Sequence, residues 1–92
     1  MDKKYYIVNN QILKLITYSQ YYTCYVVVEL KITELKSEYI GQITKYMNYI
    51  DKNIKTFDED YTIGIIICKK NNKFVIEYCS DSRIFFKEFV LV

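Results

Sequence analysis

Two charged side chains that could act on a phosphate end a strongly apolar segment. The run from Tyr25 to Lys31 reads Tyr-Val-Val-Val-Glu-Leu-Lys, so a predicted strand closes with Glu29 and Lys31, two residues apart. Because successive side chains of a strand point to opposite faces, both groups emerge on the same face. A carboxylate suits Mg²⁺, and a neighbouring ammonium can orient a water or neutralise charge in a phosphoryl transition state. The alternative is that the pair merely marks a strand returning to water.

The composition limits the chemistry that is available. The chain has 92 residues, of which 51% are hydrophobic and 26% charged, as is usual for one globular domain. It has no histidine, which excludes Ser-His-Asp and Cys-His hydrolysis, and its three cysteines form no Cys-x-x-Cys spacing that would indicate zinc. An odd cysteine count without a signal peptide indicates a cytoplasmic protein. No apolar run reaches about 18 to 20 residues, so we expect no membrane span.

The hydrophobic pattern predicts an α/β domain that opens with antiparallel strands. A first hairpin should turn at Asn9-Asn10, because asparagine tolerates the positive φ of tight turns. A later Ile-rich segment is apolar on both faces, which favours a central strand covered from both sides and parallel to the third strand. The expected strands are residues 4–8, 11–18, 23–32, 62–68 and, at an edge, 84–92, while residues 74–79 should form a strand or a short helix.

One helix is predicted between the third strand and the Ile-rich strand. Ser37 is a candidate N-cap, Glu38 lies favourably against the helix dipole, and the helix should end near Asn53. An apolar stripe at helical spacing should face the core, with a second stripe beside it. The first stripe contains Ile40, Ile43, Met47, Ile50 and Ile54, and the second contains Tyr39, Gln42, Tyr46 and Tyr49.

Five ordered blocks carry a resemblance to a known family. They read Tyr25-Val-Val-Val-Glu-Leu-Lys-Ile, Glu38-Tyr-Ile-Gly-Gln42, Tyr46-Met-Asn-Tyr, Ile63-Gly-Ile-Ile-Ile-Cys-Lys69 and Val75-Ile-Glu-Tyr78. In this order they resemble the C-terminal nuclease domain of the YhcG-type family of PD-(D/E)XK nucleases. The resemblance implies a restriction-endonuclease-like α/β core with a mixed β-sheet and few helices. It also implies that residues 1–92 are a single truncated domain, because family members carry an additional N-terminal region.

The resemblance further implies hydrolysis of DNA phosphodiesters with Mg²⁺ or Mn²⁺. Glu29 and Lys31 match the Glu-x-Lys motif, in which the glutamate is a metal ligand. Gln42 and Tyr46 match a Gln-x-x-x-Tyr motif shared with RecB-type nucleases, and residues four apart share a helix face. Glu38 also matches a family residue and is a second candidate metal ligand.

The sequence departs from the family at the upstream metal ligand. Family members have Asp about fifteen residues before the glutamate, in a block Asp-Leu-Leu-Phe-Tyr, whereas this chain has Lys14-Leu-Ile-Thr-Tyr18. If the following turn has an even number of residues, Lys14 shares a face with Glu29, where its ammonium would repel Mg²⁺ and pair with the carboxylate. No Asp or Glu lies between Asp2 and Glu29 to replace the missing ligand. We therefore expect metal binding and cleavage to be weak or absent.

Three functions stay open from the sequence. The chain is a nuclease, or a non-catalytic module that binds nucleic acid, or a remnant that pairs with itself or a full-length relative through an apolar edge strand. Because the net charge is only +2, nucleic-acid binding depends on local clusters of lysine. The candidate phosphate contacts are Lys31, Lys36, Lys45, Lys69, Lys70 and Lys73.

Overall fold

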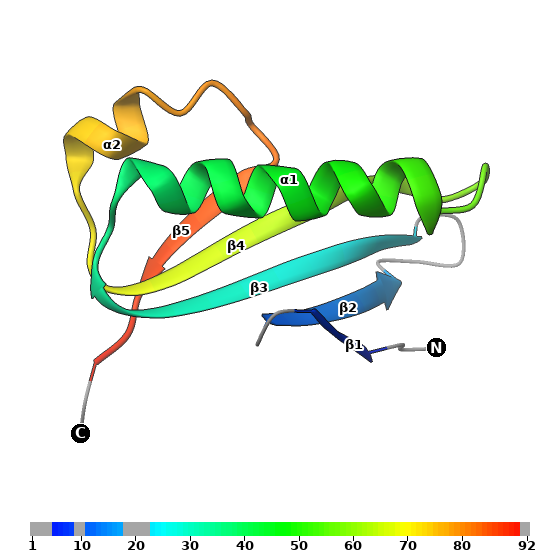
Figure 1. Ribbon diagram of the computed structural model, residues 1–92, viewed down its shortest axis with the longest axis horizontal. Coiled ribbons are helices and arrows are strands. Elements are labelled where there is room, and N and C mark those ends of the chain that lie inside the picture. Colours follow the sequence, from blue (N-terminus) through cyan, green and yellow to red (C-terminus); the bar gives the residue numbers. More distant parts are fainter. Residues whose placement is uncertain (1–4, 9–10, 18–22, 91–92) are drawn as a thin grey trace.

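The fold is a five-stranded mixed sheet with a long helix across one face (Figure 1). The computed structural model describes residues 5–8, 11–17 and 23–90, and its described side chains begin at Cys24. The elements are β1 (Tyr5–Val8), β2 (Gln11–Thr17), β3 (Thr23–Glu34), α1 (Ser37–Asn53), β4 (Asp60–Lys70), α2 (Lys73–Glu77) and β5 (Ile84–Glu88). The α/β class and the order of hairpin, third strand, helix and parallel strand are as the sequence predicts.

The strands lie in the sheet in the order of the chain. β1 and β2 are antiparallel, as are β2 and β3, whereas β3–β4 and β4–β5 are parallel. The first hairpin pairs Val8 with Gln11, and the predicted Asn9-Asn10 turn between them lies outside the described residues. Each parallel connection contains a helix, which is the usual way to join parallel neighbours. β5 is an outer strand, as expected, but it ends at Glu88 instead of Val92.

The long helix begins and ends close to the predicted residues, but its cap differs. Ser37 is the first helical residue, and the N-cap is Lys36, which makes no side-chain capping hydrogen bond. The prediction that Ser37 caps the helix is therefore wrong by one position. At the other end the helix closes at Asn53, as the pattern indicates.

The core lies between α1 and one face of the sheet. Ile43, Met47 and Ile50 are fully buried against Val27 and Ile66. Gly64 of β4 allows this close packing, because a Cβ at that position would lie 2.7 Å from the Met47 sulfur and 2.9 Å from Ile43 Cδ1. The helix thus approaches β4 more closely than a larger residue permits.

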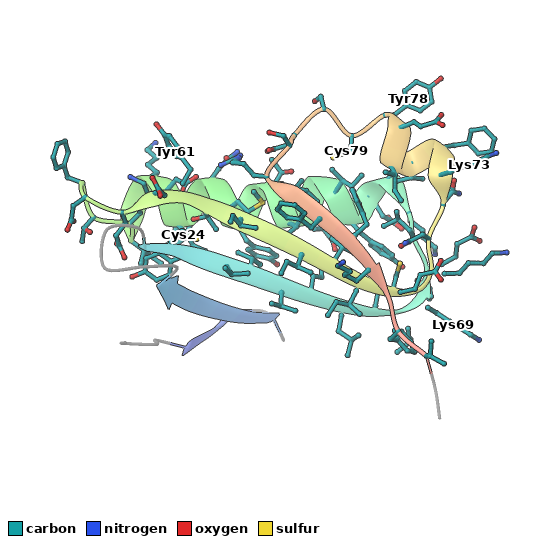
Figure 2. The ribbon with its side chains drawn as sticks, turned by 180° about the vertical axis from the view of Figure 1, so that it is seen from behind. Cys24, Tyr61, Lys69, Lys73, Tyr78 and Cys79 are labelled. Atoms are coloured by element: carbon teal, nitrogen blue, oxygen red, sulfur yellow. The ribbon has the colours of Figure 1, made fainter. Side chains whose placement is uncertain are left out.

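The opposite face of β4 is less covered than the sequence suggests. Thr62, Gly64, Ile66 and Cys68 are buried, while the alternating residues between them are half-buried. Figure 2, which views the sheet from behind, shows this face without a helix across it. The expectation of a strand covered on both sides is therefore wrong, because an apolar residue type alone does not show which face has a packing partner.

A short second helix leads from β4 to β5. In α2 the Asn72 side chain accepts hydrogen bonds from the backbone N–H groups of Phe74, at 3.0 Å, and Val75, at 3.4 Å. This cap resolves the sequence alternative for residues 74–79 in favour of a helix. Among the described residues, no helix is both long and apolar enough to cross a bilayer.

Candidate functional site

Glu29 and Lys31 lie on the face of β3 that α1 covers. The Lys31 Nζ atom is 3.1 Å from Glu29 Oε1, so the two groups form an ion pair. The Glu29 side chain is 1% exposed, whereas that of Lys31 is 28% exposed. The carboxylate therefore lies inside the fold, and the lysine connects it to the surface. The predicted shared face of these two residues is confirmed by this contact.

Tyr39, in the first turn of α1, lies against Lys31. The Lys31 Nζ atom lies 4.8 Å from the centroid of the Tyr39 ring, within the range of a cation–π contact. The phenol oxygen of Tyr39 also forms a short hydrogen bond with Thr33 Oγ1. Sequence reasoning placed Tyr39 on the second stripe, and its spacing of four and eight residues from the buried Ile43 and Met47 is the signal that would have found it.

The other helix residues predicted for the site are less closely associated with it. Gln42 and Glu38 are exposed, whereas Tyr46 is half-buried against the core. Gln42 and Tyr46 do lie one turn apart on α1, as the spacing requires.

The register of β2 on β3 corrects the expected position of Lys14. Residue 14 stands opposite Val26, and Thr17 stands opposite Thr23. Because five residues, an odd number, separate Thr17 from Thr23, paired residues have the same parity. Glu29 is three residues from Val26 and so belongs to the other face. The expectation that Lys14 faces Glu29 across one pocket is therefore wrong.

The residues around Glu29 fit a divalent metal poorly. Among the side chains that the structure describes, no group of three or more Asp, Glu, Cys or His residues could hold a metal ion. The described carboxylate inside the site is already paired with an ammonium, and the sequence has no acid between Asp2 and Glu29. Mg²⁺ sites in proteins require oxygen ligands, and a cation 3.1 Å from the carboxylate opposes a second cation there.

Four of the five surface lysines predicted to contact phosphate lie near one end of the sheet. The backbone N–H of Leu35 donates to the carbonyl of Lys70 at 2.8 Å, which joins the end of β4 to the segment before α1. We call the lysines near this junction the basic end: Lys36, Lys69, Lys70 and Lys73, all exposed. Lys45 is also exposed, but it lies about 13 Å further along the helix from Lys36. Glu34 and Glu88 are exposed in the same region, so its net charge is modest.

Cys68 lies beside Lys31 on the neighbouring strand but is not a nucleophile. The register pairs Lys31 with Cys68, whose thiol is fully buried and 3.1 Å from the Asn71 side-chain oxygen. Burial raises the pKa of the Cys68 thiol. A thiol held neutral in this way lacks the thiolate that attack requires.

Comparison with known protein families places nearly all of the chain in one of them. The family model of the YhcG PDDEXK nuclease domain matches residues 2–90. Searches among curated proteins and among solved structures gave no match. The matched range includes the Glu29–Lys31 pair, α1 and the basic end.

Proposed function

The chain belongs to the family of the YhcG PDDEXK nuclease domain, and on that premise we propose that it binds nucleic acid while its metal-dependent hydrolysis is weak or lost. Nucleases of this kind generally act with divalent metals. The observation that carries the proposal is the Glu29–Lys31 ion pair, with a 3.1 Å separation and a carboxylate that is 1% exposed. This pair preserves the Glu-x-Lys motif of the family. The sequence has no Asp or Glu between Asp2 and Glu29 that could supply a second acid.

The lost hydrolysis follows from the ligands that a metal would need. A divalent ion beside Glu29 would either displace the Lys31 ammonium or be repelled by it. A single carboxylate also offsets little of the free energy needed to remove water from Mg²⁺. Glu38 lies exposed in the first turn of α1. Because it matches a family residue, it is the candidate for a second metal ligand. In this proposal Lys31 on β3 serves as a phosphate contact, and Gln42 and Tyr46 on α1 are further candidate contacts.

Nucleic-acid binding is proposed through the basic end. Lys36, Lys70 and Lys73 are exposed cations close to the site, and lysines there neutralise phosphates in a manner that does not depend on sequence. Because acids are interspersed, we expect moderate affinity at low ionic strength and steep weakening with salt. Lys45 would extend the contact along α1.

A cleavage assay tests the first part of the proposal. Supercoiled and linear DNA are incubated with the protein and Mg²⁺ or Mn²⁺, with Glu29→Gln as the matched control that keeps the side-chain size. We expect both proteins to give the same background. Divalent-dependent cleavage by the natural sequence that is absent from the variant would contradict the proposal.

A binding titration tests the second part. The dissociation constant for a fluorescein-labelled duplex is measured by anisotropy from about 50 to 200 mM salt. We expect Lys70→Gln/Lys73→Gln to reduce the slope of log K on log salt by about 2, since each phosphate contact contributes about 0.9. The charge-matched variant Lys52→Gln/Lys55→Gln, at the far end of α1, should leave the slope unchanged. Equal slopes in both variants, or no salt-dependent binding, would exclude this surface.

A further inference from the structure

Two aromatic rings of α2 are turned to solvent, although the helix has apolar residues that pack inward. Val75 and Ile76 pack against the core, whereas Phe74 is 62% exposed and Tyr78 is 87% exposed. Phe74 and Tyr78 are four residues apart, so their rings lie along the same side of this short helix and its C-cap. Burial in the core therefore does not explain the two rings.

The rings border a groove between α2 and the first turns of α1. The groove has a volume of about 360 Å³ and is lined by Phe74, Tyr78 and Val75 from one side and by Ser37 and Ile40 from α1. Figure 2 shows Tyr78 and Lys73 at the same end of the molecule, above the sheet. The lining is largely apolar, and Ser37 and Tyr78 add hydroxyl groups. The space is large enough for a flat, partly polar group such as a nucleobase.

Two lysines flank residues that line the groove, and the acid that lines it is paired. The Nζ atom of Lys73 lies 5.4 Å from the centroid of the Phe74 ring, and Lys36 directly precedes Ser37. Asp81 also lines the groove, but its carboxylate is compensated by Arg83, with a 2.7 Å contact to Nη2. Aromatic faces with lysines beside them are the arrangement that binds single-stranded nucleic acid by stacking bases and contacting phosphates.

The groove and the Glu29–Lys31 pair share one turn of α1. Ile40 lines the groove, and its neighbour Tyr39 contacts Lys31. A strand that passes the end of α1 can therefore place one base in the groove and an adjoining phosphate near Lys31. This adjacency links the groove to the family site.

We propose that the groove holds an unpaired base of a single-stranded nucleic acid, stacked on Phe74 and Tyr78, with Lys73 and Lys36 on the flanking phosphates. The inference rests on the proposed function, since it names the kind of nucleic acid that the domain prefers. It also explains why the rings are exposed beside lysines. Duplex ends with an overhang and free single strands satisfy the same contacts, whereas paired bases inside a duplex do not.

Variants of the two rings test the proposal against a matched control. Binding of a ten-residue oligothymidine, an abasic strand of the same length and a blunt duplex is measured by anisotropy at fixed salt. The test variant is Phe74→Leu/Tyr78→Leu, and the control is Tyr61→Leu. Tyr61 is 68% exposed with Lys55 Nζ 5.1 Å from its ring, so it reproduces a lysine-covered aromatic at the far end of the molecule (Figure 2).

We expect the unmodified protein to bind oligothymidine on the order of tenfold more tightly than the abasic strand, because each stacked base contributes about that factor. The double variant should lose this preference while keeping its affinity for the abasic strand and its salt slope, since no charge is removed. Tyr61→Leu should behave as the unmodified protein. Circular dichroism confirms that each variant is folded.

Alkylation of Cys79 provides a second measurement that needs no substitution. Cys79 lines the groove and is half-buried, whereas Cys24 and Cys68 are buried. Saturating oligothymidine should slow its reaction with iodoacetamide several-fold, and the abasic strand should not. Unchanged oligothymidine affinity in the double variant, or equal alkylation rates, overturns the groove proposal while leaving nucleic-acid binding intact. Failure to bind any strand or duplex overturns both proposals.

Discussion

Lys14 stands opposite Val26 in the antiparallel pair of β2 and β3, so it occupies the face of the sheet that Glu29 does not. The positions of β2 that share the face of Glu29 are 11, 13, 15 and 17, of which Leu13 stands opposite Val27. In this register position 14, which the resemblance matches to the family aspartate, lies on the other face of the sheet from Glu29. Lys31 of the motif itself contacts the carboxylate, with its Nζ atom 3.1 Å from Glu29 Oε1.

This register predicts which single substitution supplies a second acid. Extending the pairing of Ile12 with Val28 by one residue brings position 11 next to Glu29. We expect Gln11→Asp to raise the affinity for Mn²⁺ at least tenfold, because two carboxylates then share one cation, and Lys14→Asp to have a much smaller effect. Mn²⁺ binding is measured by electron paramagnetic resonance.

The control for this prediction removes the original ligand. Glu29→Gln combined with Gln11→Asp should return the Mn²⁺ affinity to that of the unmodified protein. If Lys14→Asp instead creates the stronger site, the two strands pair in a register shifted by one residue, and position 14 does face Glu29.

Substitutions of Glu29 and Lys31 should have non-additive effects on the free energy of unfolding, because the two side chains form an ion pair. Lys31→Met leaves the carboxylate without this partner and should reduce the free energy of unfolding by about 1–3 kcal/mol, less than for a fully buried pair because Lys31 is 28% exposed. The double variant Glu29→Gln/Lys31→Met should recover part of the loss, giving a non-zero coupling energy. Urea denaturation of the four proteins measures it, and strictly additive effects would contradict the ion pair.

The two glycines should respond in opposite directions to the same substitution. Gly64→Ala should destabilise by about 1–3 kcal/mol, since its methyl group would lie 2.7 Å from the Met47 sulfur. Gly41→Ala should stabilise by about 1 kcal/mol, because Gly41 lies inside α1 with nothing within 4 Å of the added methyl. Thermal unfolding measures both, and equal shifts would contradict the close approach of α1 to β4.

Sequence reasoning predicts the parts of this fold that depend on local pattern. The helix bounds follow from the spacing of Ile43, Met47 and Ile50, and the shared face of Glu29 and Lys31 follows from strand alternation. The face of Lys14 could not be derived, because it depends on whether the connection after β2 has an odd or even number of residues. The partial exposure of one face of β4 could not be predicted either. Isoleucine residues on both faces of a strand do not show whether other elements pack on each face.

The exposed rings beside the groove show a third limit of prediction from the sequence. The pattern of residues 74–79 predicts either a strand or a short helix, so the sequence leaves the surroundings of Phe74 and Tyr78 open. The Asn72 side chain accepts hydrogen bonds from the backbone N–H groups of Phe74 and Val75, and this cap begins a helix. Tyr39 was assigned to the wrong stripe because one turn of a helix can contact both core and site.

Acid sensitivity should identify the ion-pair cluster that joins α1 to the segment before β5. Arg83 donates to Asp81 at 2.7 Å and to Asp51 at 2.9 Å, and Asp51 also accepts from the Thr62 hydroxyl at 2.7 Å. The side-chain hydrogen bond between Arg83 and Asp81 lowers the pKa of Asp81. The same bond raises the pKa of Arg83.

The lowered pKa of Asp81 fixes the direction of the pH effect. A carboxyl group with a lower pKa in the folded state stabilises the fold above its unfolded pKa, near 3.9, and this stabilisation is lost as the pH falls through the folded value. Asp81→Asn should therefore reduce stability by about 1 kcal/mol at pH 7, a value discounted for partial exposure, and the difference should shrink as the pH falls below the unfolded pKa. Urea midpoints across this range measure it, with Asp60→Asn, an exposed acid at the start of β4, as the charge-matched control. A constant difference between Asp81→Asn and the unmodified protein at every pH would show that the carboxylate charge has no part in holding the cluster.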